Sequence, residues 1–322
     1  RASPPASGEA ALVIVAFVNP HSRANRKNPR LANRLAEALG GAGRVIAAAS
    51  LEALDGEVRA LLVAPPTVIA VHGGDGTLHQ TLTALVRVFA GRALPPIAIL
   101  GGGTMNVVAA SLGIRVPAVT FLSRLAERDR AGVPPTLIHR HCLRVGDHVG
   151  FVFGNGLLAN FLVEYYAGRR YGPLRALWLL GRLCLSALAG GNFAGRVFKR
   201  FRGRVVIGGK PLEFPSLTAI GAGTVREVGL GFKLFHQADD DLDRFAVLAI
   251  HAGARALASD LLAVRTGRGI ASSHAFSTLA SEVEISPLEL DTPYTIDGDI
   301  YRAQRSLHIT LGPKVAIVDP HH

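Results

Sequence analysis

One carboxylate, Asp75, stands inside a glycine turn, in the stretch AVHGGDGTLHQTL at residues 70–82. The residues before this turn are apolar and β-branched, as in a buried strand, and those after it have the pattern of a helix. Glycines let a backbone approach a phosphate closely, and the start of a helix favours the negative charge of the ligand. A carboxylate beside a phosphate is unfavourable unless a metal ion bridges the two or the carboxylate takes a proton from a substrate. Both roles belong to phosphoryl transfer.

The same aspartate has a plainer interpretation, as a turn residue that caps a helix starting at residue 77. Two further loops favour the chemical interpretation. GGGTMN at 101–106 has the same form, and NPHSRANRKN at 19–28 follows another predicted strand. We expect the three loops to gather at one edge of a sheet, where Thr77 and Thr104 cap the following helices and donate to phosphate oxygens.

Buried-strand and helix patterns alternate through the first part of the chain. This order predicts a doubly wound parallel sheet, in which ligands bind at the carboxyl ends of the strands. The predicted strands are 11–18, 44–49, 67–71 and 96–100, and the predicted helices are 29–40, 51–62, 77–90 and 105–112.

From about residue 136 the pattern changes to short strands separated by turns rich in Gly, Asp and Pro, which is typical of an antiparallel sandwich. Helices are predicted there only at about 173–189 and 253–265. We therefore expect an α/β domain at 10–135 and a β-sandwich domain at 136–320, with the return of the last strands to the first domain left open. The strand-like pieces are LIHRHCLRV, HVGFVFG, GRVVIGG, LTAIGAG, GLGFKLF, FAVLAIH, SEVEIS, YTIDGD, SLHITL and VAIV.

Composition places the chain among globular proteins and excludes disordered and fibrous classes, since 49% of its 322 residues are hydrophobic and 18% are charged. Its two cysteines, Cys142 and Cys184, form neither a disulfide framework nor a metal cluster, which favours a reducing, cytoplasmic setting. The first residues have no apolar core of the kind found in a secretory signal peptide.

Positive charge is concentrated in one window, between Tyr165 and Leu212, which contains no Asp or Glu. We call this stretch the basic window. It should face something anionic: a lipid surface, nucleotide phosphates or nucleic acid. It matches no nucleic-acid module, so we expect no nucleic-acid partner. Its basic residues are Arg169, Arg170, Arg175, Arg182, Arg196, Lys199, Arg200, Arg202, Arg204 and Lys210.

The predicted helix at 173–189 lies inside the basic window. At ~1.5 Å per residue it is shorter than the ~30 Å hydrocarbon core of a bilayer, and it carries Arg175 and Arg182. A membrane-spanning helix is therefore excluded. Two interpretations stay open: a helix on a membrane surface, and a core-packing helix with a solvated outer face.

Taken together, these motifs resemble the diacylglycerol kinase catalytic superfamily, which includes diacylglycerol, sphingosine and ceramide kinases and bacterial lipid kinases. VHGGDGTLHQTLTAL resembles its Gly-Gly-Asp-Gly-Thr motif, AILGGGTMNVVAASLGI its second motif, FVNPHSRAN its opening turn and TIDGDIYRAQRSLHITLGPKVAIV its closing segment. The resemblance covers nearly the whole chain. It implies an ATP-binding kinase domain at 10–135 and a lipid-binding domain at 136–320. Together they would form a lipid kinase that uses ATP and Mg²⁺ to phosphorylate a lipid hydroxyl of diacylglycerol or sphingosine type.

Residue by residue, the resemblance implies that Asp297 is a candidate general base and that Asp299, in place of the usual Glu, lies near the metal. In some members the aspartate at the position of Asp75 contacts the substrate hydroxyl, so the choice between Asp75 and Asp297 stays open. Asp239 is a candidate Mg²⁺ ligand, with a solvated turn as the alternative. The implied nucleotide-binding residues are Asn19, Ser50, Gly73, Gly74, Asp75, Gly76, Thr77, Gly103, Thr104 and Asn106.

The chain departs from the family pattern at three positions. Gly102 replaces a usual Pro and is expected to loosen its loop, Arg23 replaces a usual Gly, and Asp299 replaces Glu. Two alternatives to a lipid kinase remain: a soluble NAD kinase-like enzyme, and a non-catalytic lipid- or nucleotide-binding protein. The expected partners are a lipid substrate and an anionic membrane surface reached through the basic window, with a homodimer open. The expected location is cytoplasmic and peripheral to the membrane.

Overall fold

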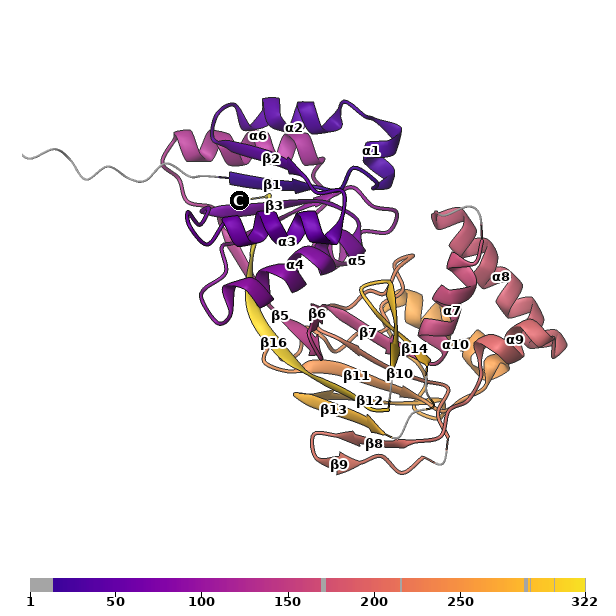
Figure 1. Ribbon diagram of the computed structural model, residues 1–322. Coiled ribbons are helices and arrows are strands. Elements are labelled where there is room, and N and C mark those ends of the chain that lie inside the picture. Colours follow the sequence, from indigo (N-terminus) through magenta and orange to yellow (C-terminus); the bar gives the residue numbers. More distant parts are fainter. Residues whose placement is uncertain are drawn as a thin grey trace, which may run out of the picture. The chain divides into compact units, whose positions relative to one another are not determined.

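The computed structural model describes residues 14–168, 172–214, 216–286, 289, 291–303 and 305–321 (Figure 1). The chain forms two compact units. The first lies within Arg1–Gly103, Ile114–His139 and Val315–His322, and the second within Thr104–Gly113 and Arg140–Lys314. Each has its own sheet structure and its own buried residues. Residues 11–13 of the first predicted strand lie outside the described part.

A parallel sheet forms the centre of the first unit, in the strand order β2-β1-β3-β4. Helices α2 and α6 cover one face of this sheet, and α3 and α4 cover the other (Figure 1). The predicted doubly wound sheet is confirmed. The bounds are β1 Ile14–Val18, α1 Arg23–Lys27, α2 Leu31–Leu39, β2 Gly43–Ala47, α3 Leu51–Ala60, β3 Val68–Gly73, α4 Asp75–Phe89, β4 Ile97–Gly101 and α6 Ala118–Arg130.

The burial of the strands agrees with the central positions of β1 and β3 in this sheet. Every residue of β1 and of β3 is buried, as a strand covered on both faces requires.

Helix α6 was not predicted, although Phe121, Leu122 and Leu125 have helical spacing and are buried. The end of the chain also joins this sheet, because Ile317 pairs in parallel with Ile97 of β4.

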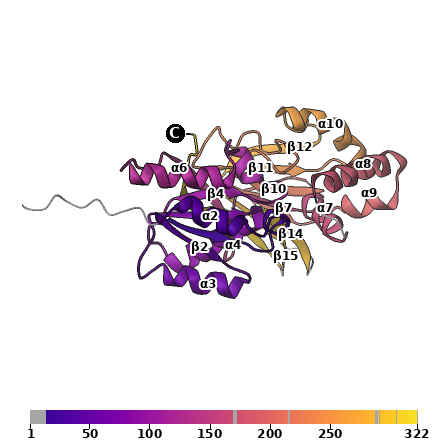
Figure 2. The same cartoon turned by 90° about the horizontal axis from the view of Figure 1, so that it is seen from above.

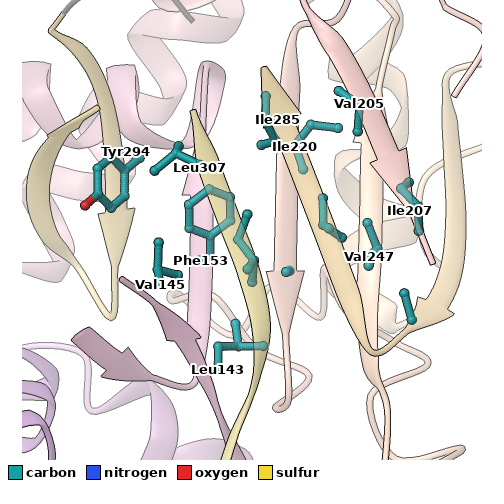
Figure 3. Packing of buried hydrophobic residues seen from close by; sticks show 14 of the residues in the cluster. Leu143, Val145, Phe153, Val205, Ile207, Ile220, Val247, Ile285, Tyr294 and Leu307 are labelled. Carbon is teal, nitrogen blue, oxygen red and sulfur yellow. The ribbon is translucent and has the colours of Figure 1, made fainter. Parts of the chain in front are cut away.

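Two sheets pack face to face in the second unit, which confirms the predicted sandwich. One contains β5, β6, β8, β9, β13 and most of β16, and the other has the order β12-β11-β10-β7-β14-β15. Side chains from both sheets form one core (Figure 3). The bounds are β5 Leu137–Val145, β6 His148–Gly150, β7 Val152–Asn155, β8 Arg204–Ile207, β9 Lys210–Pro211, β10 Ala219–Gly223, β11 Phe245–Ile250, β12 Ala275–Ala280, β13 Glu282–Ser286, β14 Thr292–Ile296, β15 Asp299–Ala303 and β16 Leu307–Val318.

Helices α7, α8, α9 and α10 lie together in the second unit (Figure 2). Both helices predicted there, α8 and α10, are confirmed, whereas α7, α9 and strand β12 were not predicted. Among the described residues, no helix combines the length and the apolar character needed to cross a bilayer. The bounds are α5 Val107–Ser111, α7 Leu157–Tyr166, α8 Pro173–Ala189, α9 Asn192–Val197 and α10 Ala254–Thr266.

The prediction of a strand at 229–235 was wrong. Gly229, Leu230 and Gly231 all have positive φ, so the backbone turns repeatedly where a strand would extend. The pieces at 306–311 and 315–318, by contrast, are parts of the single strand β16.

Candidate active site

Hydrogen bonds hold together three loops of the first unit, at 19–28, 72–77 and 101–103. Asn19 Nδ2 donates to Thr77 Oγ1 at 3.0 Å, which joins the first loop to the second. The Gly102 amide donates to Gly73 O at 2.8 Å, and the Ala24 amide donates to Gly102 O at 3.2 Å. These loops follow β1, β3 and β4, so the expected gathering at the carboxyl edge of the sheet is confirmed.

Asn19 is fixed by its neighbours as well as by Thr77. Its Oδ1 accepts from the His21 amide at 2.8 Å, and its carbonyl accepts from Asn25 Nδ2 at 2.6 Å. Ser22 caps the short helix α1 through the Asn25 amide. The asparagine side chain is therefore oriented before any ligand binds. Asn25 was not singled out in the sequence, since a buried asparagine one turn into a short helix has no distinctive pattern.

Asp75 is the first residue of α4, with Gly74 at the N-cap position. The interpretation of Asp75 as a cap for a helix starting at 77 was therefore wrong. The capping roles expected of Thr77 and Thr104 were wrong too: Thr77 lies inside α4, and α5 is preceded by Asn106 at its N-cap. Asp75 is only partly buried, and its carboxylate lies in the first turn, where the helix dipole favours negative charge.

Glycine is required at position 73. A Cβ there would lie 2.4 Å from both Cβ and Oγ1 of Thr77, the hydroxyl that accepts from Asn19. A Cβ on Gly74 would lie 3.2 Å from the Gly103 Cα. The absence of side chains thus lets these loops pack closely beside the start of α4, where backbone N–H groups are unpaired within the helix and suit an anionic ligand.

Gly102 stands where the family usually has proline, and the expectation that it loosens the loop was wrong. Its amide donates to Gly73 O at 2.8 Å, a bond that proline cannot make. A Cβ at this position would lie 2.7 Å from Cε1 and Nε2 of His72, which is buried. The glycine therefore leaves room for the imidazole and tightens the connection between two loops.

Adding a methyl group at Gly102 should destabilise the first unit. We expect Gly102→Ala to lower the free energy of unfolding by about 1–3 kcal/mol, because the buried His72 ring cannot move away freely. Urea unfolding measures this cost. In a His72→Ala background the same change should cost much less, and an equal cost in both backgrounds would contradict the proposed packing.

His72 should also make stability depend on pH. Burial lowers the pKa of its imidazole below the ordinary value of 6.5. The unfolded chain therefore takes up a proton near pH 6.5 that the folded chain does not, so stability falls as pH falls through that value and levels off only below the lowered pKa. Urea unfolding at pH 7.5 and 5.5 should show a larger loss in the native chain than in His72→Asn. Equal losses would contradict this role for His72.

The remaining predicted nucleotide-binding residues are placed as follows. Ser50 is exposed and caps α3, since its Oγ accepts from the Ala53 amide at 3.1 Å. Thr104 and Asn106 are partly buried and precede α5 in the second unit. Asn106 has a φ of 49°, a left-handed conformation that asparagine adopts more readily than most residues. Their roles in nucleotide binding stay predictions.

Asp297 occupies the turn between β14 and β15. Asp297 and Gly298 both have positive φ, as in the two-residue hairpin turn that favours Asp-Gly. The Asp297 side chain is buried, and its carboxylate accepts from the Phe151 amide at 3.0 Å and from the Val152 amide at 2.8 Å. Backbone amides thus fix the position of this carboxylate and stabilise its negative charge. These two partners were not predicted, since they lie far away in the sequence.

The other candidate metal ligands lie in different surroundings. Asp299 begins β15 and is partly buried. Asp239 forms ion pairs with Arg140 Nη1 at 3.0 Å and with Arg226 Nη1 at 3.7 Å. Nearby, Asp241 pairs with Arg244. Within the described part of the chain, no group of three or more His, Cys, Asp or Glu side chains could hold a metal ion. Metal binding by Asp239 and Asp299 stays a prediction.

Comparison with known proteins tests the resemblance in the first part of the chain. Residues 13–134 match the model of the diacylglycerol kinase catalytic domain. This part of the chain is similar to the diacylglycerol kinase catalytic domain. The catalytic domain thus contains β1 to β4 and all three loops around Asp75, and the resemblance seen in the sequence is confirmed.

Solved structures share the fold of the whole chain, beyond the catalytic domain. A crystal structure from Bacillus anthracis str. Sterne, provisionally described as a diacylglycerol kinase, aligns with a TM-score of 0.72 and 14% identity over 96% of each chain. Another, described as a diacylglycerol kinase from the same organism, aligns with a TM-score of 0.64 and 12% identity, again over 96% of each chain. No curated protein matches the sequence.

Proposed function

We propose that the chain is an ATP- and Mg²⁺-dependent lipid kinase that transfers the γ-phosphoryl group to the hydroxyl of a diacylglycerol- or sphingosine-like lipid. One observation carries this proposal: the catalytic domain brings three loops together around a carboxylate at the start of a helix. The bonds between Asn19 and Thr77 and between Gly102 and Gly73 fix these loops. Phosphoryl transfer depends mainly on such positioning and on electrostatic stabilisation.

The residues present fit a phosphate bound with a magnesium ion. Because Gly73 and Gly74 carry no side chains, the loops pack closely beside the start of α4. The N–H groups of the first turn suit phosphate oxygens, and Mg²⁺ bound with the phosphates takes oxygen ligands. When bound, the ion would neutralise charge that develops on the phosphates. The hydrogen bond between Asn19 and Thr77 would hold the first two loops in position around the ligand.

The reaction also requires an acceptor for one proton. As the lipid oxygen forms its bond to the γ-phosphorus, the bond between that phosphorus and the β–γ bridging oxygen breaks, and ADP leaves. The proton of the lipid hydroxyl passes to a carboxylate. We assign this role to Asp75, which is partly exposed at the loop edge. Asp297 is buried and both of its oxygens accept backbone N–H groups, which supports a positioning role in the β14–β15 turn.

Transfer of label from γ-labelled ATP to a panel of acceptors tests the proposal. The panel contains diacylglycerol, monoacylglycerol, sphingosine, ceramide and phosphatidylglycerol in mixed micelles, with NAD as a soluble acceptor. We expect label in the organic phase that depends on Mg²⁺ and disappears when the ion is chelated. Label in NAD alone would favour the NAD kinase-like alternative, and bound ATP without any transfer would favour a binding protein.

A further inference from the structure

Helix α8 has an outward face made of large apolar side chains. Leu174, Leu177, Trp178, Leu185 and Leu188 are between 58% and 83% exposed. Their spacing places them along one side of the helix, with Gly181 in the middle of the row. We call this set the α8 outer face. The outer face of this helix is therefore exposed and apolar.

The opposite face of α8 already packs in the core. Ala176, Leu179, Leu183 and Ala187 are buried in a cluster with residues of α7 and α9. The helix is therefore apolar on two sides, and packing within the unit accounts for only one of them. Exposed apolar rows of this kind mark a surface that binds a partner or a membrane.

Charge around the α8 outer face indicates the kind of partner. The helix contains Arg175 and Arg182 and no acidic residue. The guanidinium of Arg182 lies over the ring of Trp178 at 5.6 Å, so a cation borders the apolar row directly. An apolar row that contains tryptophan and is bordered by arginine is typical of helices that lie in the interface of an anionic bilayer.

Local ion pairs neutralise only part of the basic window. Arg196 pairs with Glu164 at 3.1 Å and Lys199 with Glu289 at 3.2 Å. Within the part of the chain that the structure describes, Arg175 and Arg182 pair with no carboxylate: Arg175 donates to backbone carbonyls, and Arg182 lies over aromatic rings. Arg169 and Arg170 lie outside the described residues. Positive charge thus remains beside the α8 outer face itself.

We propose that the α8 outer face docks on an anionic bilayer, with the helix lying in the plane of the interface. Its leucines and Trp178 enter the boundary of the acyl chains, while Arg182 reaches the lipid headgroups. A second copy of the chain fits this face less well. Two-fold pairing through α8 would place the same arginines of both copies near one another without acidic partners on that helix.

The docking face is linked to the turn that carries Asp297. Tyr166, at the end of α7, donates from its hydroxyl to Gly298 O at 3.1 Å. The preceding Tyr165 accepts from the Gly172 amide at 2.7 Å, and Arg175 donates to the Tyr165 carbonyl at 3.2 Å. Docking of α8 would therefore place this turn near the surface where a lipid substrate lies. In this respect the inference rests on the proposed function.

Trp178 is the sole tryptophan of the chain, so its fluorescence reports on α8 alone. We expect vesicles of phosphatidylcholine and phosphatidylglycerol to shift its emission to shorter wavelength, and brominated acyl chains to quench it. Pure phosphatidylcholine vesicles should produce a much smaller change. Unchanged emission with anionic vesicles would overturn the proposal.

Two variants test the face itself. Leu177→Gln with Leu185→Gln should weaken sedimentation with anionic vesicles at least tenfold, whereas Leu262→Gln, an equally exposed leucine on α10, should leave it unchanged. Equal loss in both would overturn the proposal. The molecular mass in solution, measured without lipid, tests the other occupant. If the native protein had twice the mass of the double variant, the face would bind a second copy instead.

These measurements contain no ATP, so they can fail or succeed separately from the kinase proposal. Vesicle binding without any phosphoryl transfer would support docking and contradict the kinase. Transfer to a short-chain diacylglycerol dispersed as monomers, with no vesicle binding, would support the kinase and overturn docking.

Discussion

Replacing Asp75 with Asn should lower the rate of phosphoryl transfer to lipid by about 10²- to 10⁴-fold, the usual contribution of a positioned proton acceptor. The residue begins α4 at the edge where the three loops meet. Asparagine keeps the size and shape of the side chain but cannot take up the proton of a lipid hydroxyl. Initial rates with diacylglycerol micelles measure the loss, and thermal unfolding checks that the fold is kept.

A charge-matched control separates catalysis from a general effect of charge on the catalytic domain. Asp55→Asn removes one negative charge from α3, where the carboxylate pairs with Arg87 at the surface. Such surface pairs contribute about 0–1 kcal/mol, so we expect nearly native rates and stability. If Asp75→Asn kept native activity, Asp75 would not be the proton acceptor, and Asp297 would be the next residue to test.

Replacing Asp297 with Ala should mainly destabilise the second unit. The buried amides of Phe151 and Val152 would lose their acceptor, which costs about 1–3 kcal/mol for a buried unsatisfied group. Alanine also tolerates the left-handed conformation poorly, and Asp297 has a φ of 48°. At about 2–4 °C per kcal/mol, we expect the melting temperature to fall by several degrees.

Two comparisons isolate the cause of this loss. Asp297→Asn keeps one acceptor oxygen and tolerates positive φ, so its effect should be smaller. Asp291 also has a positive φ, 62°, but its side chain is exposed. Asp291→Ala therefore carries the backbone strain without the loss of a buried acceptor. A melting temperature for Asp297→Ala no lower than that of Asp291→Ala would contradict the anchoring role of the carboxylate.

Local patterns sufficed to predict the parts of the site that lie on consecutive elements. A buried strand, a glycine turn and a helix start repeat in the first unit, and parallel strands bring such turns to one edge. That is why the gathering of the loops around Asp75 could be predicted from the sequence. The piece YTIDGD, by contrast, was predicted as one strand, but Asp297 and Gly298 form a tight hairpin turn between β14 and β15.

Contacts between distant segments could not be predicted in this way. The amides that hold Asp297 belong to Phe151 and Val152, and no local pattern connects them to the turn. His72 fills the space beside Gly102, and the Gly102 amide donates to Gly73 O. The glycine that was expected to loosen its loop therefore connects it to the neighbouring loop. The sequence predicted a helix at 173–189 and left its environment open, and the packing of Leu179 and Leu183 shows which face stays exposed.

The most direct test of the proposed function is a single comparison of the native chain with Asp75→Asn, using γ-labelled ATP, Mg²⁺ and diacylglycerol in mixed micelles. The proposed function predicts labelled phospholipid from the native chain and at least about a hundredfold less from the variant. Equal labelling by the two proteins would contradict the role of Asp75. If the native chain bound ATP but labelled neither diacylglycerol nor the other lipid acceptors of the panel, the result would contradict the lipid kinase itself.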